Sequence, residues 1–129
     1  ILLPGNPLHI PEGSLAKARA LLPLRRAGFQ AALDAGIPVA YGTDIGVFPH
    51  EQVAFDFRYL VSYGMTPLQA IQSATLTAAQ LLRLEGRAGT LEVGRWADII
   101  AVDGNPLDDV KTLENVRFVM KEGRISKHP

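Results

Sequence analysis

Apolar side chains recur every three or four residues through the first two thirds of the chain, a spacing typical of amphipathic helices. Pro23 interrupts the first such segment, because proline lacks the amide donor that a helix interior needs. Ser14 and Thr77 stand at positions where helix N-caps are expected. The pattern therefore predicts five helices, over residues 14–22, 25–35, 51–63, 67–74 and 78–84.

Local end signals support several of these helices. Thr66, Pro67 and Gln69 form a start signal: threonine caps, proline takes the first helical position and glutamine can bond back to the cap. Glycine readily adopts the left-handed conformation in which many helices end. Three predicted helices are followed by such a residue, namely Gly36, Gly64 and Gly86.

Short apolar runs bounded by turn residues predict the strands. Residues 37–41 form one run, and residues 97–103 form another that ends at the turn 104–106. Residues 116–120 and 124–127 are expected to pair as a hairpin.

These strands divide the chain into two parts. We predict an α/β part over residues 1–84, followed by a β-rich part over residues 85–129. The first part has one strand, at 37–41, and a lone strand needs neighbours for its backbone polar groups. Each part is therefore expected to be a portion of a larger sheet.

Composition excludes several classes of partner. The 13 basic and 13 acidic side chains balance, so no excess positive charge indicates nucleic acid or an anionic membrane. Hydrophobic residues make up 47% of the chain, but the apolar runs are too short to cross a bilayer. Cysteine is absent, which excludes disulfides and thiolate metal sites. We expect no nucleic-acid or membrane partner, and a cytoplasmic location is the default because nothing indicates export.

The first residues do not resemble a natural start. The chain opens at Ile1 without methionine and without the basic-then-apolar pattern of a signal peptide. We therefore expect a truncated sequence.

Asp44 is the main candidate for chemistry. It follows Gly42 and Thr43 at the end of the apolar run 37–41, and in α/β barrels catalytic groups lie at such strand ends. A divalent metal lowers the pKa of a bound water, and an adjacent carboxylate can then act as general base. The alternative is a carboxylate that accepts backbone hydrogen bonds in the turn after a strand. Both interpretations stay open from the residues alone.

His50 is the second candidate. It stands just before the predicted helix 51–63, where it could bind an anionic or carbonyl group of a substrate or simply be an ordinary helix-start residue. His9 and His128 lie among prolines at the two ends of the chain and are expected to be solvated. A working metal site normally takes three or four ligands from the protein, so Asp44 alone does not make one.

Other polar and aromatic positions favour structural roles. Asp103 is expected to support the turn that follows it, and Asp108 and Asp109 to cap a short helix toward Leu113. The spacing of an EF-hand is missing, which argues against a calcium site. Trp96 is expected to anchor the β-rich part onto the α/β part, with a ligand platform as the alternative.

Several segments, in their order, resemble the C-terminal portion of amidohydrolase-superfamily enzymes. Residues 89–98 match the pattern G-x-(I/L)-x-x-G-x-x-A-D, and residues 116–123 match V-x-x-V-x-x-x-G. The similarity covers nearly everything from residue 25 onward and is strongest to the imidazolonepropionase-like and Xaa-Pro dipeptidase-like (prolidase-type) subgroups. The other matching segments are 42–44, 49–50, 64–71, 73–75, 78–79 and 104–107.

The resemblance implies the C-terminal part of a (β/α)8 barrel over residues 1–84 and the C-terminal strands of a small β-sandwich over residues 85–129. Asp44 would lie at the tip of the eighth strand, as a metal ligand and catalytic proton shuttle. His50 matches a histidine frequent in the following loop, with a substrate-binding role. Glu51 departs from the family, which often has glycine there. The family's His-x-His, lysine and two further histidine ligands have no counterparts in this chain.

The resemblance makes a fragment of a metal-dependent amidohydrolase our first hypothesis. The parent would hydrolyse amide or peptide-like C–N bonds of a small-molecule or dipeptide-like substrate, with a divalent metal, zinc, as cofactor. One ligand cannot hold a catalytic ion tightly, so we expect the isolated chain to be inactive and to bind no metal tightly. The alternatives are a non-catalytic binding or assembly module, whose open strand edges a second copy would cover as a homo-oligomer, and one subunit of a split enzyme.

Overall fold

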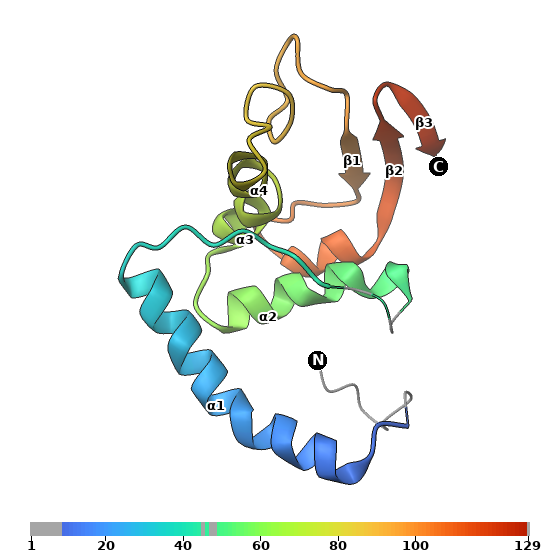
Figure 1. Ribbon diagram of the computed structural model, residues 1–129. Coiled ribbons are helices and arrows are strands. Elements are labelled where there is room, and N and C mark those ends of the chain that lie inside the picture. Colours follow the sequence, from blue (N-terminus) through green and yellow to red (C-terminus); the bar gives the residue numbers. More distant parts are fainter. Residues whose placement is uncertain (1–8, 45, 47–48, 129) are drawn as a thin grey trace. The chain divides into compact units, whose positions relative to one another are not determined.

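The computed structural model describes residues 9–44, 46 and 49–128 (Figure 1). The chain divides into two compact units, residues 1–37 and residues 38–129.

Residues 9–37, the described part of the first unit, contain one long helix, α1 (Glu12–Asp34). Pro23 lies inside it, so the predicted break there is wrong. A proline removes one backbone hydrogen bond, and the alanines, leucines and arginines around Pro23 favour helix strongly enough for it to continue. The helix also begins earlier than predicted: Pro11 holds the N-cap position, and the Ser14 amide donates to the Pro11 carbonyl at 2.9 Å.

Gly36 ends α1 as predicted. It has a φ of +68°, its amide donates to the Leu33 carbonyl, and the Ile37 amide donates to the Ala32 carbonyl. These two bonds form a Schellman motif, in which a left-handed residue satisfies carbonyls that the helix leaves free. A side chain at residue 36 would have to adopt the same unfavourable conformation.

The second unit begins with an irregular segment rather than a strand. Residues 38–44 join no β-ladder in the described part of the chain, so the predicted strand 37–41 is wrong. The Tyr41 amide donates to the Ser73 carbonyl at 2.9 Å. An apolar run becomes a strand only beside another strand, and the described chain supplies none here.

Helices follow in short pieces. The predicted helix 51–63 is a 3-10 helix, η1 (His50–Phe55), that continues into α2 (Asp56–Ser62). Gly64 ends α2 with a second Schellman motif, through bonds from the Gly64 amide to Val61 and from the Met65 amide to Leu60.

α3 (Pro67–Ala74) has the predicted bounds. The Thr66 hydroxyl accepts from the Gln69 amide at 3.2 Å, and the Gln69 side chain accepts from the Thr66 amide at 2.8 Å. The predicted capping box is confirmed, with Pro67 at the start of the helix.

α4 (Leu76–Leu81) differs from its prediction at both ends. Thr75 rather than Thr77 holds the N-cap position, and the helix ends before Gly86. Arg83 takes the left-handed position with a φ of +57°. Its amide donates to Gln80 and the Leu84 amide donates to Ala79, so an arginine occupies the place that glycine usually fills.

The sheet has three antiparallel strands in the order β1-β2-β3: β1 (Ile99–Val102), β2 (Val116–Lys121) and β3 (Arg124–Lys127). Ile99 pairs with Met120, and Lys121 pairs with Arg124 across the turn. Positive φ angles at Glu122 (+48°) and Gly123 (+79°) are those of a type I′ hairpin turn. The predicted hairpin is confirmed.

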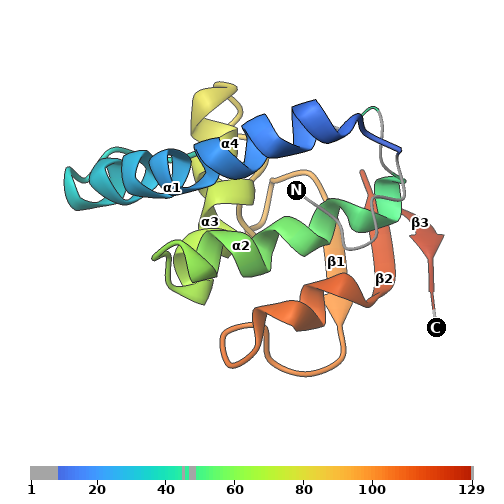
Figure 2. The same cartoon turned by 90° about the horizontal axis from the view of Figure 1, so that it is seen from below.

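A second 3-10 helix, η2 (Val110–Glu114), connects β1 to β2 and lies against η1 and α2 (Figure 2). Arg58 of α2 pairs with Glu114 of η2 at 3.3 Å. The buried side chains of the second unit come from its helices and their flanks, whereas no residue of the three strands is fully buried. The buried residues are Met65, Ala70, Ser73, Ala79, Val110 and Leu113. In the part of the chain described, no helix is long and apolar enough to span a membrane.

Candidate functional site

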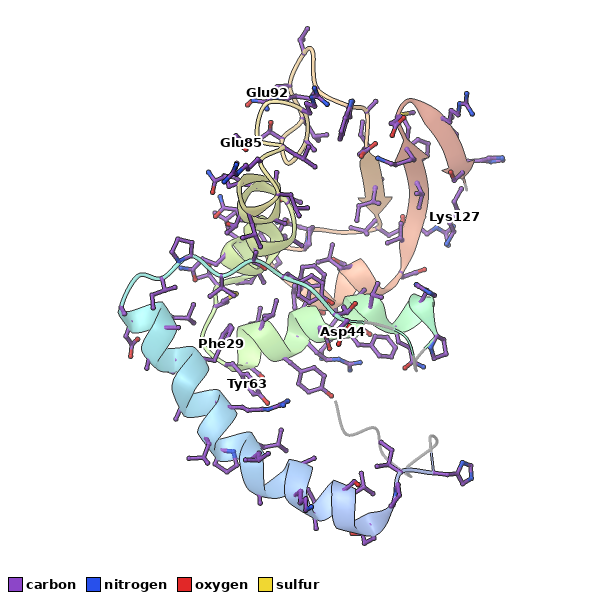
Figure 3. The ribbon with its side chains drawn as sticks, in the orientation of Figure 1. Phe29, Asp44, Tyr63, Glu85, Glu92 and Lys127 are labelled. Carbon is purple, nitrogen blue, oxygen red and sulfur yellow. The ribbon has the colours of Figure 1, made fainter. Side chains whose placement is uncertain are left out.

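Asp44 lies at the end of segment 38–44 (Figure 3), with an exposed side chain. Its φ is +48°, in the left-handed region that costs most side chains energy and that aspartate tolerates better than most. Within the described residues its carboxylate takes part in no hydrogen bond or ion pair. The exposed carboxylate is accessible to an external ligand, and the metal-ligand and turn-stabilising interpretations both remain predictions.

Tyr41 attaches this segment to the helices. Its hydroxyl donates to the Val53 carbonyl at 2.5 Å, at the end of η1, and lies 3.4 Å from the Asp56 carboxylate at the start of α2. Its ring lies 5.0 Å from that of Phe57, centre to centre. With the amide bond to Ser73, both the backbone and the side chain of Tyr41 are fixed three residues before Asp44.

Tyr41 and Asp56 perturb each other. Burial raises the pKa of the Tyr41 phenol, and the neighbouring Asp56 charge raises it further. Burial also raises the pKa of the Asp56 carboxyl, while the hydrogen bond from Tyr41 opposes that rise. Asp56 Oδ1 is buried and has no hydrogen-bond partner among the described residues. No sequence pattern singles out this pair, because the two residues are 15 positions apart.

His50 is the first residue of η1, directly after Pro49, and its side chain is exposed. Residues 45, 47 and 48, between the two candidates, lie outside the described residues. No hydrogen bond or ion pair in the described chain joins Asp44 to His50. Asp44 precedes this connection in the chain and His50 follows it, and both side chains are exposed.

Asp44 is the candidate metal ligand at this site. Among the described residues, no three histidine, aspartate or glutamate side chains gather closely enough to hold an ion. The free carboxylate of Asp44 is an oxygen donor suited to a divalent cation. Asp44 on its own supplies one ligand, whereas a catalytic ion normally takes three from the protein.

The remaining acidic candidates have structural partners. Asp103 pairs with Arg117 at 3.4 Å, across the β1–β2 ladder. Asp109 caps η2, accepting from the Lys111 amide at 3.0 Å, as predicted. Asp108 instead accepts from the Asn105 side chain at 3.0 Å. None of these bonds depends on a bound ion.

The pattern at residues 89–98 holds the second unit together. Gly89 has a φ of +93°, and a Cβ atom there would lie 2.8 Å from the Ala79 Cβ atom in α4. At the other end, Asp98 accepts from Lys121 Nζ at 2.5 Å and from the Glu122 amide at 2.7 Å. The glycine lets the chain approach α4, and the aspartate fixes the hairpin turn. The conspicuous motif is therefore structural.

Trp96 lies within this motif and is partly exposed. The Arg87 guanidinium lies 5.8 Å and Lys121 Nζ 5.4 Å from its ring, both within cation–π range. Its amide donates to the Arg87 carbonyl at 2.7 Å. Trp96 thus links the segment after α4 to strand β2, within the second unit.

Comparison with known proteins identifies the class. The sequence profile of the amidohydrolase family matches residues 4–126. The chain belongs to the amidohydrolase family. An ochratoxinase from Aspergillus niger is 35% identical over 134 residues, which cover 100% of this chain and 28% of that protein. An imidazolonepropionase from Alkaliphilus metalliredigens is 26% identical over 96% of this chain and 30% of its own length.

Solved structures agree with this assignment. A Xaa-Pro dipeptidase with bound methionine is 42% identical with a TM-score of 0.83, over 92% of this chain and 29% of that one. A prolidase complexed with N-methylphosphonate-L-proline is 28% identical with a TM-score of 0.82, over 94% and 30%. The resemblance and the fold class inferred from the sequence, part of an α/β amidohydrolase barrel, are confirmed. The chain spans less than a third of the length of these relatives.

Proposed function

We propose that this chain is the C-terminal part of a metal-dependent amidohydrolase that cleaves amide or peptide-like C–N bonds. Family membership supports a hydrolase acting on such bonds. The observation that most supports this proposal concerns Asp44. Its carboxylate is exposed and takes part in no hydrogen bond within the described chain. Its backbone lies in the left-handed region, at the end of a segment that Tyr41 attaches to the helices. In this proposal residues 1–84 belong to the barrel and residues 85–129 to the accessory β-sandwich.

Asp44 performs two tasks in this proposal. It is one ligand of a divalent ion, zinc, whose other ligands come from outside the described residues. The ion, when bound, supplies a water activated for attack on the carbonyl carbon. The Asp44 carboxylate accepts a proton from that water and passes it to the leaving nitrogen, since expulsion of an unprotonated amide nitrogen is slow. Residues 1–129 alone are then inactive and retain no metal tightly.

The substrate we propose is dipeptide-like. Two of the solved relatives are a Xaa-Pro dipeptidase and a prolidase with a proline phosphonate, which supports a substrate with a free carboxylate next to the bond that breaks. His50 is exposed at the start of η1, six residues after Asp44 in the chain. We propose that it binds the anionic or carbonyl group of this substrate.

The test uses the complete gene product, whatever its length. Metal content and hydrolysis of Xaa-Pro dipeptides are measured for the native protein, for Asp44→Asn and for a matched control, Asp103→Asn, whose carboxylate pairs with Arg117 on the sheet. We expect Asp44→Asn to lower kcat about 10²- to 10⁴-fold, the usual contribution of a general base, and to release metal faster. Asp103→Asn should behave as the native protein.

Native activity and metal retention in Asp44→Asn would overturn the proposal. Turnover together with stoichiometric zinc in residues 1–129 alone would contradict the proposed inactivity of this part. If the complete gene product neither binds metal nor hydrolyses these substrates, the binding or assembly module takes the place of the enzyme.

A further inference from the structure

We propose that Tyr41 is a positioning residue for the site: its hydroxyl sets where Asp44 lies relative to His50. This inference rests on the proposed function of Asp44. The Tyr41 hydroxyl donates to the Val53 carbonyl at 2.5 Å. Tyr41 belongs to the segment that ends at Asp44, and Val53 belongs to η1, the helix that begins at His50. A single hydrogen bond therefore joins the two elements that carry the candidate site residues.

The acceptor lies where two kinds of helix meet. Val53 is in the last turn of η1, and its carbonyl also accepts from the backbone at Asp56, where α2 begins. The phenol therefore bonds to backbone already fixed by helix geometry rather than to a mobile side chain. A bond to fixed backbone transmits position, because the Val53 carbonyl cannot swing away without breaking helix hydrogen bonds.

The Tyr41 backbone provides the second attachment. Its amide donates to the Ser73 carbonyl near the end of α3, and Ser73 is only 2% exposed. One residue thus ties segment 38–44 to α3 through its backbone and to η1 through its side chain. Asp44 follows three residues later, so this anchor limits how far its carboxylate can move.

Ring packing alone does not account for a tyrosine at this position. The contact with Phe57, at 5.0 Å between ring centres, would remain with phenylalanine. The hydroxyl is partly buried and close to the Asp56 carboxylate, where a polar group costs stability unless it is bonded. Tyr41→Phe therefore separates the two roles: it keeps the packing and removes the bond to Val53.

The experiment compares Tyr41→Phe with Tyr59→Phe in the complete gene product. Tyr59 lies on α2, so its substitution makes the same chemical change in a neighbouring element outside segment 38–44. Three quantities are measured: the rate of zinc release to a chelator, amide hydrogen exchange along the chain, and kcat and KM for a Xaa-Pro dipeptide. Asp44→Asn is run beside them as the reference for loss of the ligand itself.

We expect Tyr41→Phe to speed zinc release about three- to ten-fold, the factor that corresponds to one net hydrogen bond. Exchange should rise at residues 42–44 and stay native in β2, and kcat should fall with KM changed by less. Tyr59→Phe should leave all three quantities native. In a third variant, 4-aminophenylalanine at position 41 restores a donor toward Val53 and should restore the native release rate.

Two results would overturn the inference. In the first, Asp44→Asn speeds zinc release and Tyr41→Phe does not. Asp44 would then bind the metal without being positioned by the Tyr41 hydroxyl. In the second, Tyr41→Phe raises exchange throughout the second unit, or 4-aminophenylalanine restores folding without restoring the release rate, so Tyr41 is structural only. Native zinc release in Asp44→Asn itself is a different result, because it rejects the proposed function instead.

Discussion

Gly89 lies directly against Ala79 of α4. A Cβ atom at residue 89 would lie 2.8 Å from the Ala79 Cβ atom and 3.0 Å from the Thr75 carbonyl oxygen. Neither neighbour is the flexible end of a long side chain, so an added Cβ atom could be accommodated only if the backbone shifted. The first glycine of the family motif therefore sets how closely the chain approaches α4 as it turns toward the sheet.

Gly89→Ala is expected to destabilise the chain by about 2–4 kcal/mol, the sum of left-handed strain and overpacking. Gly94→Ala is the matched control: its φ is +88°, but nothing lies within 4 Å of the added Cβ atom. It should cost about 1–2 kcal/mol, from strain alone. Urea unfolding of the two variants measures the difference, and equal losses would show that the contact with Ala79 relaxes freely.

Asp44→Gly is expected to separate stability from function. In the metal-free protein it should raise the free energy of unfolding by about 0.5–1 kcal/mol, because the strain relieved exceeds the extra backbone entropy that glycine loses. Glu122→Gly, at the same φ of +48° in the hairpin turn, is the control. Both variants should gain stability, and only Asp44→Gly should lose zinc and activity. A loss of stability in Asp44→Gly would mean that the carboxylate serves the fold.

Arg83→Gly should stabilise α4. Arg83 holds the left-handed position of the Schellman motif with a φ of +57°, where glycine avoids the Cβ penalty. We expect a gain of about 0.5–1 kcal/mol in thermal or urea unfolding. Gly64→Ala, at the same position after α2 with a φ of +117°, should lose about 1–2 kcal/mol. A neutral Arg83→Gly would show that the arginine side chain makes compensating contacts.

The ion pair between Asp98 and Lys121 predicts stability losses at both extremes of pH. The Lys121 bond lowers the pKa of Asp98 below its usual 3.8, so this contribution is present above pH 3.8 and is lost as pH falls through the lowered pKa. The same bond raises the pKa of Lys121 above 10.5, so its contribution is present below that pH and is lost as pH rises through the raised pKa.

Both groups are exposed, so the effect should be small and should weaken with salt. Amide exchange at Glu122, which donates to Asp98, is the direct measurement across pH. Asp98→Asn should flatten the acid side of the profile, whereas Asp34→Asn on α1 should leave it native. An unchanged profile in Asp98→Asn would assign the acid sensitivity to other carboxylates.

Tyr41 predicts a second alkaline effect. Its pKa is raised from 10.0, mainly by burial, so the folded chain keeps the phenol protonated at a pH where the unfolded chain ionises it. Stability should therefore fall as pH rises above 10.0, and tyrosinate absorbance should increase together with unfolding. Tyr41→Phe should reduce this dependence. Ionisation of Tyr41 without loss of structure would contradict the buried, bonded phenol.

Elements whose cause lies within a few residues were predictable from the sequence. The capping box of Thr66 and Gln69, the glycine ends of α1 and α2 and the turn between β2 and β3 all follow from side chains next to the backbone groups they satisfy. The candidate position of Asp44, after an apolar run and a glycine, was visible for the same reason. The family resemblance rested on such short patterns.

Other features depended on residues distant in the sequence. An apolar run at 37–41 becomes a strand only if another strand lies beside it, and the described chain brings the Ser73 carbonyl to Tyr41 instead. The hydrogen bond between Tyr41 and Val53 spans 12 positions, so no periodic sequence pattern predicts it. Sequence by itself determined the capping box, the glycine ends of α1 and α2 and the hairpin turn, because their energies are set between neighbours. Only the tertiary structure decided which distant backbone groups meet, because that depends on how the helices pack.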